Sequence, residues 1–398
     1  MKKRPILLLF LAVAALVASC VYDYDPQIDG EGGYMIVEGN IIIGEVSEIR
    51  LSYSWSLVDT LATQDEERMK VLYQSKMHVE DSQGGRYENT IGASAGIYYG
   101  SPYAYFDMRN ADPALEYRLV IENANGTYVS SWDKAISPGQ IDSLSYVISD
   151  DRSTMSICVS THTGDAGPSY YRWRVEETWE YHAETSAAYK YIYTGGLDGD
   201  VVPLPDSEST YRCWTGGMRS EIMTGSSEDL SEDRLVNHQL YSLNNRDERI
   251  SVCYQPQVTQ MRIPEEAYRY WEQMNRNGQD VGGLFSPEPS EMRGNVANLD
   301  NPAEMVLGYV GVMTVTRATM YVENSLTRFY RNPVRPERAL DTLRTRAEYL
   351  EAYTLGKRPT FDVWNDIGNW IGYEWWPVNC LDCRLRGGTT KRPPNWPL

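Results

Sequence analysis

The sequence predicts a mainly β protein in which two β-sandwich domains follow one another. The second domain carries a short helical insertion, and the C-terminal segment is irregular. Short segments alternate apolar and polar residues, as half-buried strands do, and Gly, Asn and Asp residues that favour turns separate them. The chain has thirty Tyr and eleven Trp but only five Phe. This composition suits cross-strand pairs in extracellular sandwiches, although the same side chains also suit contacts with sugars or proteins.

Residues 1–19 have the pattern of a secretory signal that ends at a lipidated cysteine. Three basic residues at positions 2–4 precede an apolar run over residues 6–17, which is too short to span a bilayer. Small residues then lead to Cys20, as lipoprotein signal peptidase requires. We therefore expect residues 1–19 to be removed and Cys20 to carry acyl chains such as palmitate, which anchor the protein to a membrane.

Residues 20–33 are predicted to form an acidic tether, since they contain Asp and Glu residues, Pro26 and three Gly residues. Val21 stands where an Asp commonly retains lipoproteins at the inner membrane. The nearby Asp23 and Asp25 resemble the surface-export signal of Bacteroidota lipoproteins, although a solvated tether would have the same composition. The expected location is the cell outer membrane, with the protein lipid-anchored and exposed at the surface.

The charge of the chain argues against a nucleic-acid partner. The formal net charge is −18, and removal of the three basic residues of the signal would bring it to −21. A strongly acidic surface repels nucleic acid and anionic lipid.

The first domain is predicted over residues 34–136. Strands are expected over residues 34–41 and 48–54, and a strand–turn–strand unit over 77–87. A hairpin is expected over residues 116–131, because Asn125 and Gly126 form a dipeptide that favours a two-residue turn.

The second domain is predicted over residues 137–398. Its strands are expected at 141–148, 155–161, 170–181, 249–258 and 309–322. Alternation along 170–181 places Tyr171, Trp173 and Val175 on one face. Residues 264–277 begin with a Pro and acidic residues and are followed by Gly278, which predicts a helix with an apolar face that packs on the core. A second helix is expected over residues 337–352.

Motifs that resemble catalytic sites lack the context that catalysis needs. Residues 92–96 match G-x-S-x-G, but the residues after Ser94 cannot form the helix of a nucleophile elbow. The four His residues are not spaced for a zinc motif. We therefore expect no enzymatic activity, no metal and no cofactor.

Cys380 and Cys383 form a Cys-x-x-Cys motif in a loop rich in Pro and Gly. A structural zinc would need two further ligands nearby, and a thioredoxin-like motif would open a helix. Because close thiols oxidise outside the cytoplasm, we expect a local Cys380–Cys383 disulfide. Cys158 and Cys253 lie in predicted strands, where they could pair or remain two buried thiols, and the pairing of Cys213 is open.

Several segments together resemble the Bacteroidota outer-membrane lipoprotein family known as domain of unknown function 4249. They are residues 34–39, 169–173, 176–180, 213–214, 268–271, 282–290, 294–296, 301–309, 380–384, 387–389 and 393–396. Cys158 and Cys253 depart from the usual cysteines of this family. Residues 96–98, 117–121 and 128–131 also resemble transthyretin-like sandwiches, so the two domains are expected to be immunoglobulin-like or transthyretin-like.

The family resemblance implies an outer-membrane lipoprotein, and members of the family tend to be encoded beside TonB-dependent transporters of the starch-utilisation type. We hypothesise a non-catalytic accessory or binding partner of such a nutrient transporter, and the alternative is a structural or adhesive lipoprotein of the cell envelope. If a ligand site exists, the candidates are Trp214, Trp375 and Trp376, which lie in loop-like contexts. These three side chains could instead fill the gap between domains.

Overall fold

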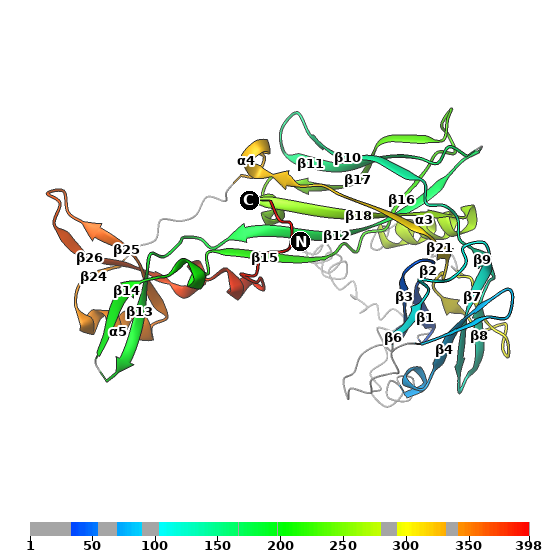
Figure 1. Cartoon of the computed structure of the whole chain (residues 1–398), viewed down its shortest axis with the longest axis horizontal. Coiled ribbons are helices and arrows are strands. Elements are labelled where there is room, and N and C mark those ends of the chain that lie inside the picture. The colour runs from blue at the N-terminus through cyan, green and yellow to red at the C-terminus, as the bar shows by residue number, and fades with distance from the viewer. Residues whose placement is uncertain are drawn as a thin grey trace, which may run out of the picture.

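The computed structural model describes residues 33–54, 70–89, 103–165, 167–196, 198–279, 293–331 and 341–397. They form an elongated, mainly β molecule in which a central sandwich lies between an N-terminal sandwich and a smaller distal unit (Figure 1). The sandwich architecture that the sequence predicts is confirmed. None of the helices in these ranges has the length and apolar character needed to span a bilayer.

The N-terminal sandwich consists of two sheets with the strand orders β20-β1-β3-β6 and β19-β8-β7-β4-β5. Alternation along β3 buries Ile49 and Leu51, which pack with Val79, Phe106 and Leu119 between the sheets. The strands are β1 (Met35–Gly39), β2 (Ile41–Ile42), β3 (Val46–Tyr53), β4 (Lys76–Asp81), β5 (Arg86–Glu88), β6 (Tyr103–Asp107), β7 (Glu116–Asn123), β8 (Gly126–Ser130), β9 (Asp133–Lys134), β19 (Val296–Asn298), β20 (Val306–Leu307) and β21 (Val312–Met313).

The predicted hairpin of β7 and β8 is confirmed, with Asn123 paired to Gly126 and the turn one residue earlier than expected. The predicted domain boundary at residue 136 needs correction, because later residues return to this sandwich. Strand β19 pairs with β8, and β20 and β21 run parallel to β1 and β2. Strands of two or three residues with such distant partners leave no periodic signal in a sequence.

The central sandwich packs the sheet β10-β11-β17 against the sheet β15-β12-β18-β22. Tyr171, Trp173 and Val175 share the buried face of β12, as predicted, and Ile157 and Val258 lie in the same core. The strands are β10 (Gln140–Ile148), β11 (Thr154–His162), β12 (Tyr170–His182), β15 (Arg212–Met218), β16 (Met223–Ser226), β17 (Arg234–Asn244), β18 (Cys253–Ile263), β22 (Val315–Thr319) and β23 (Val322–Glu323).

A buried ion-pair network joins strands of the central sandwich to the segments beside them. The Glu177 carboxylate accepts hydrogen bonds from Arg219 at 2.7 Å, from Arg249 at 2.9 Å and from the Tyr254 hydroxyl. The Tyr254 hydroxyl also lies 2.7 Å from that of Tyr241. Only 6 % of the Glu177 and Arg219 side chains is exposed, so the two buried charges compensate each other. Glu221 beside Arg219 and Asp247 beside Arg249 extend the network.

The predicted helix over residues 264–277 is confirmed as α3 (Glu265–Gln279), with two acidic residues in its first turn. Its Ala267 packs with Met261 and Ile263 of β18 and with Met313 of β21. The Tyr270 hydroxyl accepts a hydrogen bond from the Gly308 amide at 3.2 Å. The helix therefore helps to join the central sandwich to the N-terminal one.

The distal unit was not part of the sequence prediction, which assigned residues 137–398 to one sandwich. It combines a hairpin inserted between β12 and β15 with a sheet from the C-terminal region. Tyr191 of the hairpin packs with Tyr349, Ala352 and Trp375 in a separate core. The elements are β13 (Tyr189–Gly195), β14 (Asp198–Pro203), β24 (Asp341–Leu343), α5 (Arg346–Thr354), β25 (Lys357–Trp364) and β26 (Trp370–Pro377).

The predicted helix over 337–352 is wrong in its described first part, because residues 341–343 form strand β24. The helix starts later, where Thr345 and Glu348 form a capping box. The predicted strand over residues 249–258 begins instead with a 3₁₀ turn and then follows β18. Other helices are a short turn of helix over residues 70–73, α4 (Asn324–Thr327) and the 3₁₀ helices η1 (Asp206–Glu208), η2 (Glu248–Ile250), η3 (Val378–Cys380) and η4 (Cys383–Arg386).

Candidate functional site

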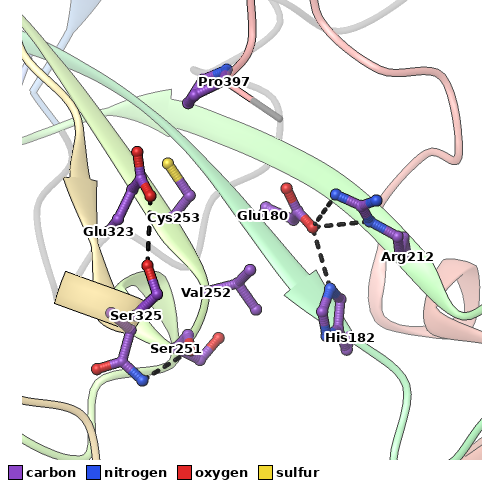
Figure 2. A pocket seen from close by; sticks show the side chains of 10 residues that line it. Glu180, His182, Arg212, Ser251, Val252, Cys253, Glu323, Ser325 and Pro397 are labelled. Atoms are coloured by element: carbon purple, nitrogen blue, oxygen red, sulfur yellow. Dashed lines mark hydrogen bonds and ion pairs between the residues drawn. The ribbon is translucent and has the colours of Figure 1, made fainter. Parts of the chain in front are cut away.

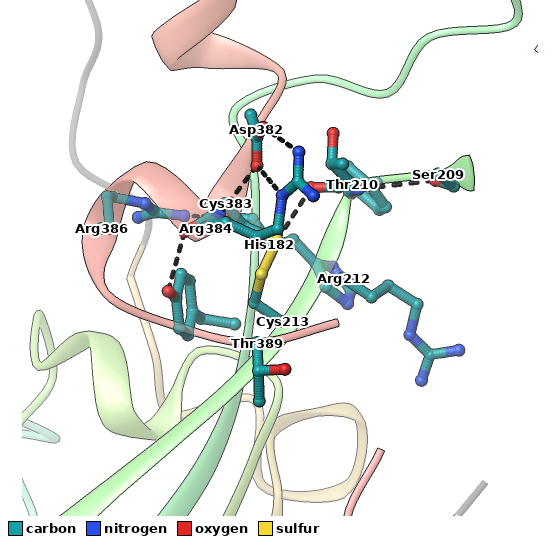
Figure 3. Close-up of a disulfide and its surroundings, with 12 residues drawn as sticks. His182, Ser209, Thr210, Arg212, Cys213, Asp382, Cys383, Arg384, Arg386 and Thr389 are labelled. Carbon is teal, nitrogen blue, oxygen red and sulfur yellow. Dashed lines mark hydrogen bonds and ion pairs between the residues drawn. A yellow bond between two sulfur atoms is a disulfide. The ribbon is translucent and has the colours of Figure 1, made fainter. Parts of the chain in front are cut away.

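The predicted Cys380–Cys383 disulfide is wrong, because Cys383 is bonded to Cys213 of β15, 170 residues earlier, as Figure 3 shows. The Cys383 amide donates to the Thr210 carbonyl at 3.0 Å, next to the start of β15. This hydrogen bond places the Cys383 side chain against β15. Cys380 is itself buried. Cys158 and Cys253 are two separate buried thiols, which was one of the two expectations.

The disulfide belongs to a wider set of contacts that hold the C-terminal segment on the central sandwich. Trp214 and Thr389 exchange two backbone hydrogen bonds of 2.8 and 2.9 Å. The Tyr181 hydroxyl donates to the Cys383 carbonyl at 2.9 Å, and the Arg386 guanidinium lies 4.5 Å from the Tyr181 ring centre. The segment after Cys383 is irregular, as predicted, with only the short turn at residues 383–386 and one isolated bridge among its described residues, but these contacts hold it against the central sandwich.

Two of the three tryptophans proposed as a ligand platform are closed to solvent, so this prediction is wrong for them. Trp214 is 6 % exposed and packs with Cys253 and Trp396. Trp375 is 1 % exposed and stacks on Tyr349 at 5.6 Å. Trp376 is half-buried, with an indole nitrogen that is buried and makes no hydrogen bond in the described structure. The C-terminal segment covers Trp214, and the distal core covers Trp375.

Cys20, the predicted lipidation site, lies outside the described residues.

A polar cavity of about 370 Å³ lies beside Trp214, where the C-terminal end of β12 meets β15, β18 and β23 (Figure 2). Glu180 and His182 of β12 and Arg212 of β15 form one wall, and Cys253 and Glu323 contribute to the other. Sequence reasoning did not nominate these residues, because the segments that carry them lie far apart in the chain. Alternation along β12 could at most suggest that Glu180 and His182 share a face.

Glu180 is the most enclosed charge of this cavity, at 2 % exposure. One carboxylate oxygen is hydrogen-bonded to His182 Nε2 at 3.0 Å and accepts from Arg212 Nε at 2.9 Å. The other oxygen accepts from Trp396 Nε1 at 2.9 Å. Burial raises the pKa of Glu180, but the hydrogen bonds from these neighbours outweigh burial and hold the pKa below its ordinary value of 4.5. The carboxylate therefore fixes the C-terminal Trp396 to β12.

The Cys253 thiol that lines the cavity is not an activated nucleophile. Burial, together with the negative charges of Glu323 and Glu180, raises the pKa of the Cys253 thiol to about 12. A protonated thiol is a poor nucleophile and a poor metal ligand at neutral pH. The described ranges also contain no group of three His, Cys, Asp or Glu side chains that could hold a metal ion. The geometry suits non-covalent binding of a small polar molecule, or attachment of the C-terminal segment.

The Glu180 site gives a pH prediction. Since the pKa of folded Glu180 lies below the unfolded value, its ionised form stabilises the fold above pH 4.5, and this stability is lost as the pH falls through the folded pKa. Urea unfolding between about pH 6 and pH 3 should show a smaller loss of unfolding free energy on acidification for Glu180→Gln than for the wild type. Glu176→Gln, at an exposed position of β12, is the control. If Glu176→Gln reduced the dependence of the unfolding free energy on pH and Glu180→Gln left it unchanged, Glu180 would not be the group responsible.

An exposed apolar cluster forms a second candidate site at the end of the β25–β26 hairpin. This tip cluster consists of Trp364, Ile367 and Trp370, which are 58, 81 and 40 % exposed. The two Trp residues lie opposite each other across the hairpin. The sequence carries a signal that was missed: two Trp flank the turn-favouring residues Asn365, Gly368 and Asn369.

Comparison with known proteins gives one family match and no match to a curated protein. The family model covers residues 21–319. This range includes the inserted hairpin and most of both sandwiches, whereas β24–β26, Cys383 and the tip cluster follow it in the chain. The chain therefore belongs to the family described as Domain of unknown function (DUF4249).

Proposed function

We propose that this protein is an outer-membrane lipoprotein that serves as a non-catalytic accessory or binding partner of a TonB-dependent nutrient transporter. The observation that carries the proposal is the tip cluster, which exposes apolar side chains at the end of a unit that projects from the central sandwich (Figure 1). Exposed apolar clusters of this kind mark interaction sites. The Cys213–Cys383 disulfide supports an oxidising compartment. The net charge of −18 disfavours nucleic acid as the partner.

Lipidation of Cys20 is the first requirement of this function. Replacing Cys20 with Ser should abolish labelling by a palmitate analogue and release the protein from the membrane pellet, because the acyl chains would be its anchor. The matched control is Cys158→Ala, which removes a buried thiol and should leave both readouts unchanged. A Cys20→Ser protein that is still labelled and still sediments with membranes would contradict the lipoprotein assignment.

The transporter partnership is tested by affinity purification of the tagged full-length protein from solubilised outer membranes of its native host. We expect a TonB-dependent transporter to co-purify in near-stoichiometric amount, and deletion of the gene to slow growth on the nutrient of that transporter. If no such transporter co-purifies and deletion impairs only adhesion, the alternative role as a structural or adhesive lipoprotein replaces this proposal.

A further inference from the structure

The tip cluster is held by a rigid turn. The Asn365 side-chain oxygen accepts hydrogen bonds from the Ile367 amide at 3.2 Å and from the Asn369 amide at 2.8 Å. The Asn365 amide donates to the Asn369 carbonyl at 2.9 Å, and Gly368 adopts a φ of +81° that L side chains rarely adopt. The apex residue Ile367 therefore has a defined position although its side chain is 81 % exposed.

The base of the hairpin is equally well fixed. The Trp370 indole nitrogen donates to Asp362 at 3.0 Å, and the Trp370 ring contacts Tyr373 edge-on at 5.3 Å. Tyr189 of the inserted hairpin also donates to Asp362. A rigid apolar protrusion loses little conformational entropy when it binds, which favours affinity. Tryptophan is also among the residues that contribute most to binding at protein interfaces.

The charged residues around the tip cluster indicate whether it binds a membrane or another protein. Residues 361–370 contain two carboxylates, Asp362 and Asp366, and no Lys or Arg, in a chain with a net charge of −18. Side chains that anchor proteins to anionic membranes are accompanied by basic residues. Carboxylates beside an apolar apex instead match an apolar socket with basic groups at its rim.

We infer that the tip cluster inserts into an apolar socket with a cationic rim on an integral outer-membrane protein. The inference rests on the proposed function and specifies where the contact lies. Ile367 fills the socket, Trp364 and Trp370 cover its edge, and Asp366 faces the basic rim. The distal unit acts as an arm that carries this contact away from the two sandwiches.

The test compares Ile367→Asp with Leu326→Asp in the tagged, lipidated protein. Leu326 lies on α4 and is 78 % exposed, so the two substitutions place the same charge at equally exposed positions and should leave the thermal midpoint unchanged. We expect Ile367→Asp to reduce the co-purified transporter at least tenfold, and Leu326→Asp to retain it. Asp366→Lys should also weaken the complex, whereas Asp366→Asn should weaken it less.

A photo-crosslinking residue at position 367 identifies what the tip contacts, and the same residue at position 326 is the control. A crosslink from position 367 to the transporter that co-purifies with the wild type, mapped to an apolar site flanked by Lys or Arg, supports the inference. Crosslinks to lipid, to a second copy of this chain or to nothing would overturn it. So would tight binding of the wild type, but not of Ile367→Asp, to neutral phosphatidylcholine vesicles.

The outcomes also separate this inference from the proposed function. If the wild type and Ile367→Asp recover the transporter equally, the docking site is wrong and the accessory role stands. If the wild type recovers no integral outer-membrane protein, both are wrong.

Discussion

Replacing Glu177 with Ala is expected to lower the free energy of unfolding by about 3–5 kcal/mol. The substitution leaves the guanidinium of Arg219, whose side chain is 6 % exposed, and that of Arg249 without their shared carboxylate. It also removes the acceptor of the Tyr254 hydroxyl. Glu221 still contacts Arg219 and Asp247 still contacts Arg249. However, the buried Arg219 guanidinium loses the buried carboxylate that best offsets its desolvation cost, so the loss should exceed that of an ordinary surface ion pair. Urea unfolding at pH 7 measures the effect.

The neighbouring position supplies the control for this prediction. Glu176 lies on the same strand but faces solvent, so Glu176→Ala should change the free energy of unfolding by less than about 0.5 kcal/mol. Glu177→Gln should lower the free energy of unfolding by an amount between those of Glu176→Ala and Glu177→Ala, because it keeps a neutral acceptor for the same donors. Equal effects of Glu176→Ala and Glu177→Ala would show that the network contributes no more than surface charges.

Loss of the Cys213–Cys383 disulfide is expected to cost about 3–5 kcal/mol, because the bond closes a long loop in the unfolded chain. The two cysteines are separated by 170 residues, which places the entropic effect at the upper end of the usual range. Cys213→Ala and Cys383→Ala should therefore be similarly destabilised, and the double variant should be little worse than either because the same bond is lost. Urea unfolding under non-reducing conditions measures all three variants.

Connectivity provides the independent check. Proteolysis without reductant should yield a peptide pair that joins the segment around Cys213 to the segment around Cys383. A peptide with an internal Cys380–Cys383 bond would contradict the structure and restore the pairing that the motif suggested. Cys158→Ala, which removes a buried thiol that forms no disulfide, should be destabilised less than Cys213→Ala.

The strands that could be predicted are those whose pattern is local. Alternation along β3 and β12 identified their buried faces, and the helix signals of α3 placed it within two residues. Each of these signals depends on residues a few positions apart, so it is visible without knowing what the element packs against. The Asn-Gly dipeptide located the β7–β8 hairpin for the same reason.

The distal unit could not be predicted because neither of its parts is complete alone. The β13–β14 hairpin finds its core only against Tyr349 and Trp375, more than 140 residues later. In the sequence, Trp375 of this core lies in a loop-like context, which makes it a candidate for a ligand platform. Aromatic side chains suit both environments, and only packing distinguishes them.

The sequence alone determined the mainly β class, the buried faces of the long strands and helix α3, because short-range periodicity and end signals encode them. The tertiary structure decided that Cys213 pairs with Cys383, that Glu180 meets Arg212 and Trp396, and that the two Trp of the tip remain exposed. These outcomes depend on which distant segments lie together. The packing that brings such segments together is non-local, so no short window of the sequence contains it.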